Sequence, residues 1–339
     1  MDRLIVTIAV HDMPNTLAAL LHHSLDFAGV FPPASLPVPD ALQVFNVERS
    51  ADSAGMLARF VCPISRLDEL VAHHRAHHSN TALVVSVLPR GGRTPGEFLA
   101  SLESDLATIQ RIRAEHIGHL RIDTIEMRVP AEVETPAALR RLLAAVDALV
   151  ARHEDAARQV FFELAPSPSL PALIATLAEH VATAPRPSAP VLGYKLRTGG
   201  SGSAVAPSST QVALAMSTAA THGVPMKCTG GLHRPLRTLE SGAAAHGFVN
   251  LLVTAALAEQ REGAPADLIE LLDETSAEAF TFDPSAIRWR DHDIPLTAVV
   301  RARRRLLAAF GSCYVETPRQ ELQKLGWWPG TKYTADSAH

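Results

Sequence analysis

Apolar runs of strand length alternate along the chain with segments of helical periodicity. The helical segments carry leucine and alanine at three- and four-residue steps, as at 136–154 and 169–184. A third segment opens with a capping box between Ser208 and Gln211 and ends at Gly223. The eight predicted strands are 27–31, 59–65, 82–89, 124–130, 159–166, 191–197, 225–229 and 279–284.

This alternation predicts parallel strands joined by right-handed crossovers, and eight such units indicate an α/β fold of the (β/α)8 TIM-barrel type. A doubly wound open sheet is the alternative, because losing the weak runs 27–31 and 279–284 would leave six strands. We expect a single barrel domain over 1–339. Residues 1–25 would be an N-terminal extension whose extra helix closes the barrel bottom, and 296–339 a last helix and tail.

Two of the predicted strands end in a similar motif, VLGYKLRTGG at 191–200 and VPMKCTGGLHRP at 224–235. Each places a lysine near the end of an apolar run and a Gly-Gly pair a few residues later. Since alternate residues of a barrel strand face inward, Lys195 and Arg197 would share the inner face, and so would Lys227 and Thr229. Both lysines are therefore expected inside the barrel.

Charged residues on the two preceding strands are expected to face the same way, namely Glu126 and Arg128 on the fourth strand and Glu163 on the fifth. Barrel interiors are normally filled by Val, Ile and Leu, and ionised groups there are costly unless paired or close to the carboxyl rim. The cluster predicts an active-site mouth, with the two glutamates as general acid–base candidates. A buried ion-pair network that only plugs the barrel is the structural alternative.

Neighbouring strands lie about 4.8 Å apart, so the amines of Lys195 and Lys227 are expected close together. A neighbouring cation and partial desolvation lower the pKa of a lysine and expose its lone pair, which a Schiff-base enzyme requires. The alternative is that both lysines, with Arg197, clamp an anionic substrate.

The two Gly-Gly pairs follow the strands directly, where bare backbone N–H groups can approach a phosphate or carboxylate. His233 in the second loop is a candidate proton shuttle, and His246 and Asn250 are candidates to shuttle protons and to orient an oxygen. Asp26 is expected to serve a simple turn before the first strand. The catalytic set is Lys195, Lys227, Glu126, Glu163 and His233, and the substrate- or anion-binding set is Arg128, Arg197, Thr198, Gly199, Gly200, Thr229, Gly230, Gly231, Arg234, His246 and Asn250.

Residues 191–237 resemble deoxyribose-phosphate aldolase, a class I aldolase barrel. That family carries its Schiff-base lysine in a Lys-Thr-Ser-Thr-Gly segment on the sixth strand, and a second lysine in a Lys-Pro-Ala-Gly-Gly-Val-Arg segment on the seventh. The resemblance implies that Lys195 forms the Schiff base, that Lys227 lowers its pKa, and that Gly230 and Gly231 bind phosphate. This chain departs from the pattern at Leu196, Arg197, Cys228 and Thr229. The phrases DFAGVFPPAS, KCTGGLHRP, HGFVNLL and FGSCYVETP resemble a group of uncharacterised bacterial proteins.

The composition and charge of the chain indicate which partners and which cellular compartment to expect. The 339 residues carry a net charge of -4 with a mean hydropathy of +0.09, so no global basic field points to nucleic acid. The arginine run at 301–305 is read as a solvated helix face. Three widely spaced cysteines fit a reducing compartment. No signal-peptide core or membrane-length run occurs, and we expect a cytoplasmic protein without membrane contact.

No cofactor and no metal are expected. The HHRAHH run, which places His73 one turn before His77, is read as a solvated face with adventitious metal affinity. A divalent ion between Glu126 and Glu163 stays open, as does a homo-oligomer.

The expected function is a class I aldolase-type lyase acting through an imine on a small phosphorylated or carboxylated carbonyl compound. Two alternatives remain: a sugar-phosphate isomerase that uses the lysines as an anion clamp, and a non-catalytic protein that binds an anionic metabolite.

Overall fold

The computed structural model describes residues 13–52, 55–77, 81–153, 157–183, 190–200, 206–240, 243–260 and 265–328. The helices are α1 (Asn15–Leu21), α2 (Val38–Ala51), η1 (Ile64–Arg66), α3 (Leu67–His77), α4 (Pro95–Glu115), α5 (Pro136–Arg152), α6 (Leu170–Thr183), α7 (Ser209–His222), α8 (Phe248–Gln260), α9 (Pro265–Asp273), η2 (Ala277–Ala279), α10 (Leu296–Arg305) and α11 (Glu316–Lys324). The strands are β1 (Leu25–Phe27), β2 (Leu57–Pro63), β3 (Leu83–Leu88), β4 (Leu120–Arg128), β5 (Gln159–Glu163), β6 (Val191–Arg197), β7 (Met226–Thr229), β8 (Thr238–Glu240), β9 (Ala243–Ala245), β10 (Phe280–Phe282), β11 (Ala286–Trp289), β12 (His292–Pro295) and β13 (Leu307–Ser312).

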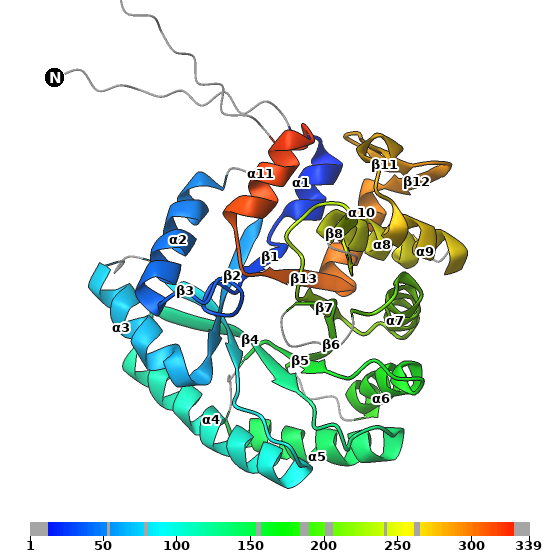
Figure 1. Cartoon of the computed structure of the whole chain (residues 1–339). Coiled ribbons are helices and arrows are strands. Elements are labelled where there is room, and N and C mark those ends of the chain that lie inside the picture. Colours follow the sequence, from blue (N-terminus) through cyan, green and yellow to red (C-terminus); the bar gives the residue numbers. More distant parts are fainter. Residues whose placement is uncertain are drawn as a thin grey trace, which may run out of the picture.

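Eight parallel strands close into a barrel in the order β1-β13-β7-β6-β5-β4-β3-β2, and helices surround it (Figure 1). This confirms the (β/α)8 prediction and excludes the open sheet. Six strands fall close to their predicted positions, and β6 coincides with its prediction. The capping box at Ser208 and the left-handed Gly223 that ends α7 are also present.

The predicted eighth strand, 279–284, was wrong. Its residues form η2 and β10, and β10 is an edge of a small antiparallel sheet with β11 and β12. The last barrel strand is instead β13, inside the segment expected to be a helix and tail. Its sequence, LAAFGS, begins with residues that favour helix and follows a helical arginine run. Local propensity therefore predicted a helix, whereas pairing with β1 and β7 makes this segment a strand.

The first strand lies two residues earlier than predicted. Strand β1 contains Asp26, so the expectation of a turn role before the strand was wrong. Helix α1 lies within the predicted N-terminal extension and packs on α10 at the amino end of the barrel. A cavity of about 610 Å³ lies between these two helices and the strand starts in the described part of the chain, and residues 1–12 of the predicted extension lie outside that part.

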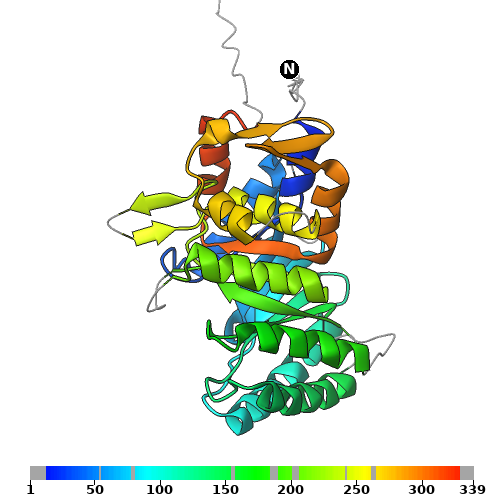
Figure 2. The same cartoon turned by 90° about the vertical axis from the view of Figure 1, so that its right-hand side faces the viewer.

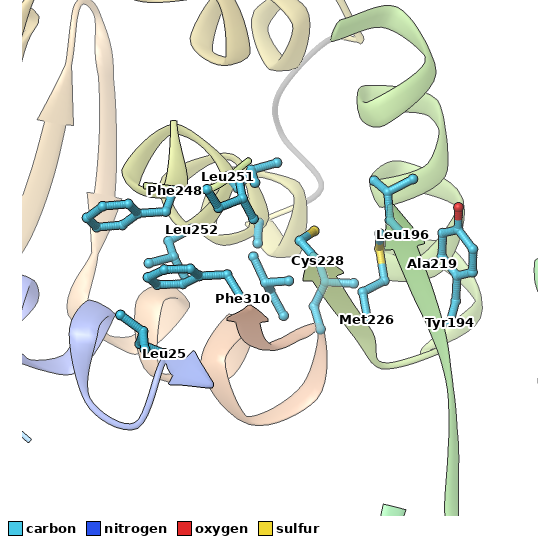
Figure 3. Close-up of a cluster of buried hydrophobic side chains, with 14 of the residues drawn as sticks. Leu25, Tyr194, Leu196, Ala219, Met226, Cys228, Phe248, Leu251, Leu252 and Phe310 are labelled. Atoms are coloured by element: carbon cyan, nitrogen blue, oxygen red, sulfur yellow. The ribbon is translucent and has the colours of Figure 1, made fainter. Parts of the chain in front are cut away.

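The outer faces of the strands build the core with the helices. Tyr194 and Leu196 of β6 and Cys228 of β7 point toward the helix layer, as the alternation predicted (Figure 3). Phe310 of β13 stacks on Phe248 of α8, with ring centroids 4.7 Å apart. Helix α8, which lies in the long excursion between β7 and β13, is buried almost all round because it packs against α7, α9, α10 and β13.

That excursion carries two small sheets. The β8–β9 hairpin projects from the body (Figure 2), and the three-stranded sheet β10–β12 lies beside α1, where Thr16 donates a hydrogen bond of 2.5 Å to the Asp283 carbonyl. Neither contributes to the barrel wall. In the described ranges, no helix combines the length and apolar character that crossing a membrane requires.

We expect Phe310→Ala to lower the free energy of unfolding by about 3–5 kcal/mol, because the ring is fully buried and its removal leaves a cavity against Phe248. Urea unfolding followed by circular dichroism measures the loss. Leu239→Ala on β8 is the control, since Leu239 is 77% exposed and its truncation should cost less than about 0.5 kcal/mol. A loss below about 1 kcal/mol for Phe310→Ala would contradict the packing described.

Candidate active site

Two lysines share one carboxylate at the centre of the barrel. Lys195 of β6 and Lys227 of β7 are register partners on adjacent strands. The Lys195 Nζ lies 3.0 Å from Glu126 Oε2, and the Lys227 Nζ binds Glu126 Oε1. Lys195 also binds Glu163 Oε2 at 3.0 Å, and Lys227 binds Asp26 Oδ2 at 2.5 Å. Each ammonium therefore lies between two carboxylates, one of which is common to both.

The network continues toward the amino end of the barrel. Ser86 of β3 donates a hydrogen bond of 2.5 Å to Glu126 Oε1. Arg59 of β2 pairs with Asp26 at 3.3 Å and with Asp123 at 2.7 Å. The described cluster thus holds four carboxylates and three cations, drawn from six of the eight barrel strands. Charges this well buried are tolerated because each is paired and hydrogen-bonded.

Two neighbouring carboxylates hold Lys195 in its protonated form. Burial alone would lower the pKa of Lys195, but Glu126 and Glu163 outweigh it and hold that pKa above its usual value. Burial would raise the pKa of Glu126, yet Lys227, Lys195 and the Ser86 hydroxyl hold it well below its usual range. The expectation that Lys227 lowers the pKa of Lys195 was therefore wrong for the structure described, because Glu126 separates the two positive charges.

A cavity of about 300 Å³ opens above the lysines at the carboxyl ends of the strands. One wall is polar and carries Lys195, Lys227, Glu126, Arg197, His233 and the backbone of Thr229–Gly231. The opposite wall is apolar and carries Phe31, Pro32, Pro33, Val61 and Leu88. A further cavity of about 390 Å³ lies among the outer helices beside His180 and His222, away from the lysines. The carboxyl-end cavity is the candidate active site, as expected for this fold.

The two Gly-Gly loops fit against each other. Thr198 donates from its N–H and hydroxyl to the Thr229 carbonyl, at 2.7 and 3.1 Å, and from its hydroxyl to the Gly230 carbonyl at 2.8 Å. Gly230 has a φ of 94°, and a Cβ there would lie 2.1 Å from the Gly199 carbonyl oxygen. Gly200, Gly230 and Gly231 also line the cavity. The glycines therefore permit both the close contact of the loops and backbone access to a ligand.

Five of the predicted site residues do not line the cavity, and three of these five form hydrogen bonds that stabilise the fold. Arg128 and Arg234 are exposed and do not line the cavity. His246 donates to the Pro207 carbonyl at 2.7 Å, and burial lowers its pKa. Asn250 accepts from the Arg237 N–H and donates to the Leu271 and Glu274 carbonyls. Thr198 is likewise buried, and it fastens the two loops rather than facing the cavity.

Several residues of the site were missed from the sequence. Asp26, Arg59, Ser86 and Asp123 complete the ion network, although a carboxylate in a three-residue strand carries no periodic signal. Cys313 also lines the cavity, and its Sγ lies 3.1 Å from the Pro32 carbonyl oxygen. One unused signal was composition, because only 4 of the 31 basic Lys and Arg residues are lysines. Two of those four are the central pair.

Lys195 stands where a metal between Glu126 and Glu163 would have to lie, with its ammonium 3.0 Å from an oxygen of each. Of the histidine run, His73 and His77 stack on the outer face of α3, and His74 is buried with its Nε2 2.8 Å from the Thr81 carbonyl oxygen. His78 lies outside the described residues. The run belongs to the helix layer and not to the cavity.

Comparison with known proteins found no family profile that matches the chain and no curated protein that is significantly similar to it.

We expect Gly230→Ala to lower the free energy of unfolding by about 2 kcal/mol or more, because Ala at a φ of 94° is strained and its Cβ would overlap the Gly199 carbonyl. Gly96→Ala on α4 is the matched control. No atom lies within 4 Å of its added Cβ, and Ala there should leave stability equal or slightly higher. Equal unfolding midpoints for Gly230→Ala and wild type would show that the loops do not interlock.

Stability should depend on pH through Glu126. Its pKa is lower folded than unfolded, so its contribution is complete above about 4.5 and is lost as the pH falls below that value. Glu126→Gln should cost about 3 kcal/mol at pH 7, at the lower end for a broken buried pair because each lysine keeps a second carboxylate. The difference in free energy of unfolding between wild type and Glu126→Gln should be smaller at about pH 3 than at pH 7, as measured by urea titration.

Glu103→Gln is the control for this titration, because Glu103 forms an exposed pair with Arg152 and its loss should be undetectable at either pH. A difference in free energy of unfolding between wild type and Glu126→Gln that stays constant between the two pH values would mean that folding does not lower the pKa of Glu126.

Proposed function

We propose that this protein is a class I aldolase-type lyase in which Lys195 forms an imine with a small carbonyl compound that carries a phosphate or carboxylate. The observation that carries the proposal is the pair of buried lysines on adjacent strands, held by the two oxygens of Glu126 and open to the cavity at the carboxyl end of the barrel. Lys195 is 6% exposed and Lys227 is 2% exposed, so few atoms of either face water.

The balance of charges around the lysines favours a catalytic role for them over a role as an anion clamp. A clamp needs cations whose charge is not already neutralised, whereas Lys195 and Lys227 lie against Glu126, Glu163 and Asp26. Carboxylates in contact with a lysine repel an anion but accept its proton. Anion binding is better suited to the rim, where Arg197 and the N–H groups of the glycine loops line the cavity.

The network supplies a complete route for the protons of imine formation. Lys195 first passes a proton to Glu163, and its freed lone pair attacks the carbonyl carbon. Lys227 protonates the resulting oxygen, and the extra proton on the attacking nitrogen then passes to the Lys227 amine, which leaves the neutral carbinolamine and restores the Lys227 ammonium. Glu163 then returns its proton to that hydroxyl, which leaves as water as the C=N bond forms. Glu126, ionised and in contact with both amines, stabilises the positive charge that moves between them.

Carbon–carbon cleavage then needs one acceptor. When a carboxylate or His233 accepts the β-hydroxyl proton, the C–C bond breaks, its electron pair reduces the iminium to an enamine, and an aldehyde leaves. Protonation of the enamine and hydrolysis by water restore the Lys195 amine. His233 lines the cavity and lies 3.0 Å from the Ser312 hydroxyl, which orients its ring.

Borohydride trapping tests the proposal. With four lysines in the chain, peptide mass mapping after reduction identifies the modified residue unambiguously. We expect phosphorylated or carboxylated aldehydes and ketones to leave a reduced adduct on Lys195. Lys195→Arg keeps the positive charge but cannot form an imine, and it should reduce turnover by more than about 10³-fold.

Lys324→Arg is the control, because Lys324 is exposed on α11 and pairs only with Glu321 among the described residues. It should match wild type in adduct formation and turnover. A substrate that is turned over without any adduct on Lys195, and whose turnover survives Lys195→Arg, would refute the imine and leave the isomerase alternative, in which Glu126 or Glu163 moves a proton without covalent catalysis.

A further inference from the structure

A second cavity, of about 610 Å³, lies at the amino end of the barrel, opposite the candidate active site. The end of α1 and the loop before β1 form one side, and the last turn of α10 forms the other. Its floor reaches the first residues of the barrel strands, including Arg59 and Gln159. The volume is that of a drug-sized ligand site.

The described lining contains no carboxylate, and its permanent positive charges come from α10 and the floor, because burial, with His22 and Arg59, lowers the pKa of His23 on the α1 side. It carries His22 and His23 from the α1 side, Arg303, Arg304 and Arg305 from α10, and Arg59 from the floor. Among the residues that the structure describes, none of the three α10 arginines forms an ion pair, whereas Arg301 on the same helix pairs with Glu259 at 3.1 Å. The reading of 301–305 as a solvated face therefore holds for Arg301, Arg304 and Arg305, which are exposed, but not for Arg303.

Arg303 is the least compensated cation of this group. Its guanidinium donates to the backbone carbonyls of His22, His23, Leu307 and Ala308, and its buried Nε has no hydrogen-bond partner within the described ranges. Burial lowers the pKa of Arg303 to about 10, an effect that the charge of Asp26 only partly offsets. An anion in the cavity would compensate this charge.

The floor of this cavity is connected to the lysines. Arg59 pairs with Asp26 at 3.3 Å, and the second oxygen of Asp26 lies 2.5 Å from the Lys227 ammonium. An anion that draws the Arg59 guanidinium toward the amino end weakens its hold on Asp26. By thermodynamic linkage, a change at Asp26 alters the affinity of that anion by the same coupling.

We propose that the amino-end cavity binds a small polyanion with two or more phosphate groups, and that this site is coupled to Lys227 through Arg59 and Asp26. Arginine forks match phosphate oxygens bidentately, and the arginines of α10 together with Arg59 on the floor suit phosphates at either end of one ligand. Ligand binding at this site is measured without turnover, so its test does not depend on the imine chemistry.

Isothermal titration with inorganic pyrophosphate tests the site. We expect one binding site in wild type and at least about 10-fold weaker binding in Arg304→Ala/Arg305→Ala, whose exposed positions leave the fold intact. Arg301→Ala is the matched control on the same helix and should bind as wild type does. Equal affinity in the double variant and the wild type would overturn the proposal.

Two further experiments distinguish binding at the amino-end cavity from binding at other anion sites. Arg197→Ala, at the carboxyl-end cavity, should retain pyrophosphate binding; if it abolishes binding while Arg304→Ala/Arg305→Ala does not, the ligand occupies the active site and the proposal is refuted. Competition by a short single-stranded oligonucleotide with equal affinity and a steep salt dependence would mark a non-specific basic face and would also refute it.

Asp26→Asn tests the coupling by the same titration. Releasing Arg59 from Asp26 should tighten pyrophosphate binding several-fold. Glu163→Gln removes a carboxylate of the same network that does not contact Arg59, and it should leave the affinity unchanged. Equal effects of the two substitutions, or no effect of Asp26→Asn, would show that the amino-end site is not linked to Lys227.

Discussion

Glu126 is the group on which the centre of this barrel depends. One carboxylate, 4% exposed, accepts from Lys195 on one oxygen and from Lys227 and Ser86 on the other. Without it, two ammonium groups on adjacent strands would face each other in a medium of low dielectric, where their repulsion is poorly screened. Asp26 and Glu163 complete the balance from the two outer sides.

In the proposed lyase this arrangement would hold protons inside the site. Carboxylates and ammonium groups alternate from Asp26 to Glu163, so a proton would pass between neighbours without leaving the barrel. The proposed anion site lies at the rim, where Arg197 and the glycine loops line the cavity. The proposed function thus assigns binding and proton transfer to different layers of one cavity. Barrels commonly divide the work in this way, since their loops vary while their strands stay constant.

The fold and the central residues were predictable where periodicity is strong. Apolar runs bounded by turn residues predict strands β2 to β7. The two-residue period of a strand then predicts that Lys195, Lys227, Glu126 and Glu163 face inward. The β13 strand was not predictable, because LAAFGS has helical propensity and becomes a strand only by filling the gap between β1 and β7. Asp26 was missed for a related reason: a strand of three residues shows no alternation.

The sequence by itself determined the barrel, the inward pair of lysines and the two glycine loops, because each follows from local periodicity and from short spacing along the chain. Only the tertiary structure decided which carboxylates pair with the lysines. Glu126 and Glu163 on strands β4 and β5 raise the pKa of Lys195, and Lys227 pairs with Asp26, which lies 201 positions away in the chain. It also decided that His246 and Asn250 hold loops together while Cys313 faces the cavity. Electrostatic interaction depends on separation in space, which closure of the barrel sets and local sequence does not encode.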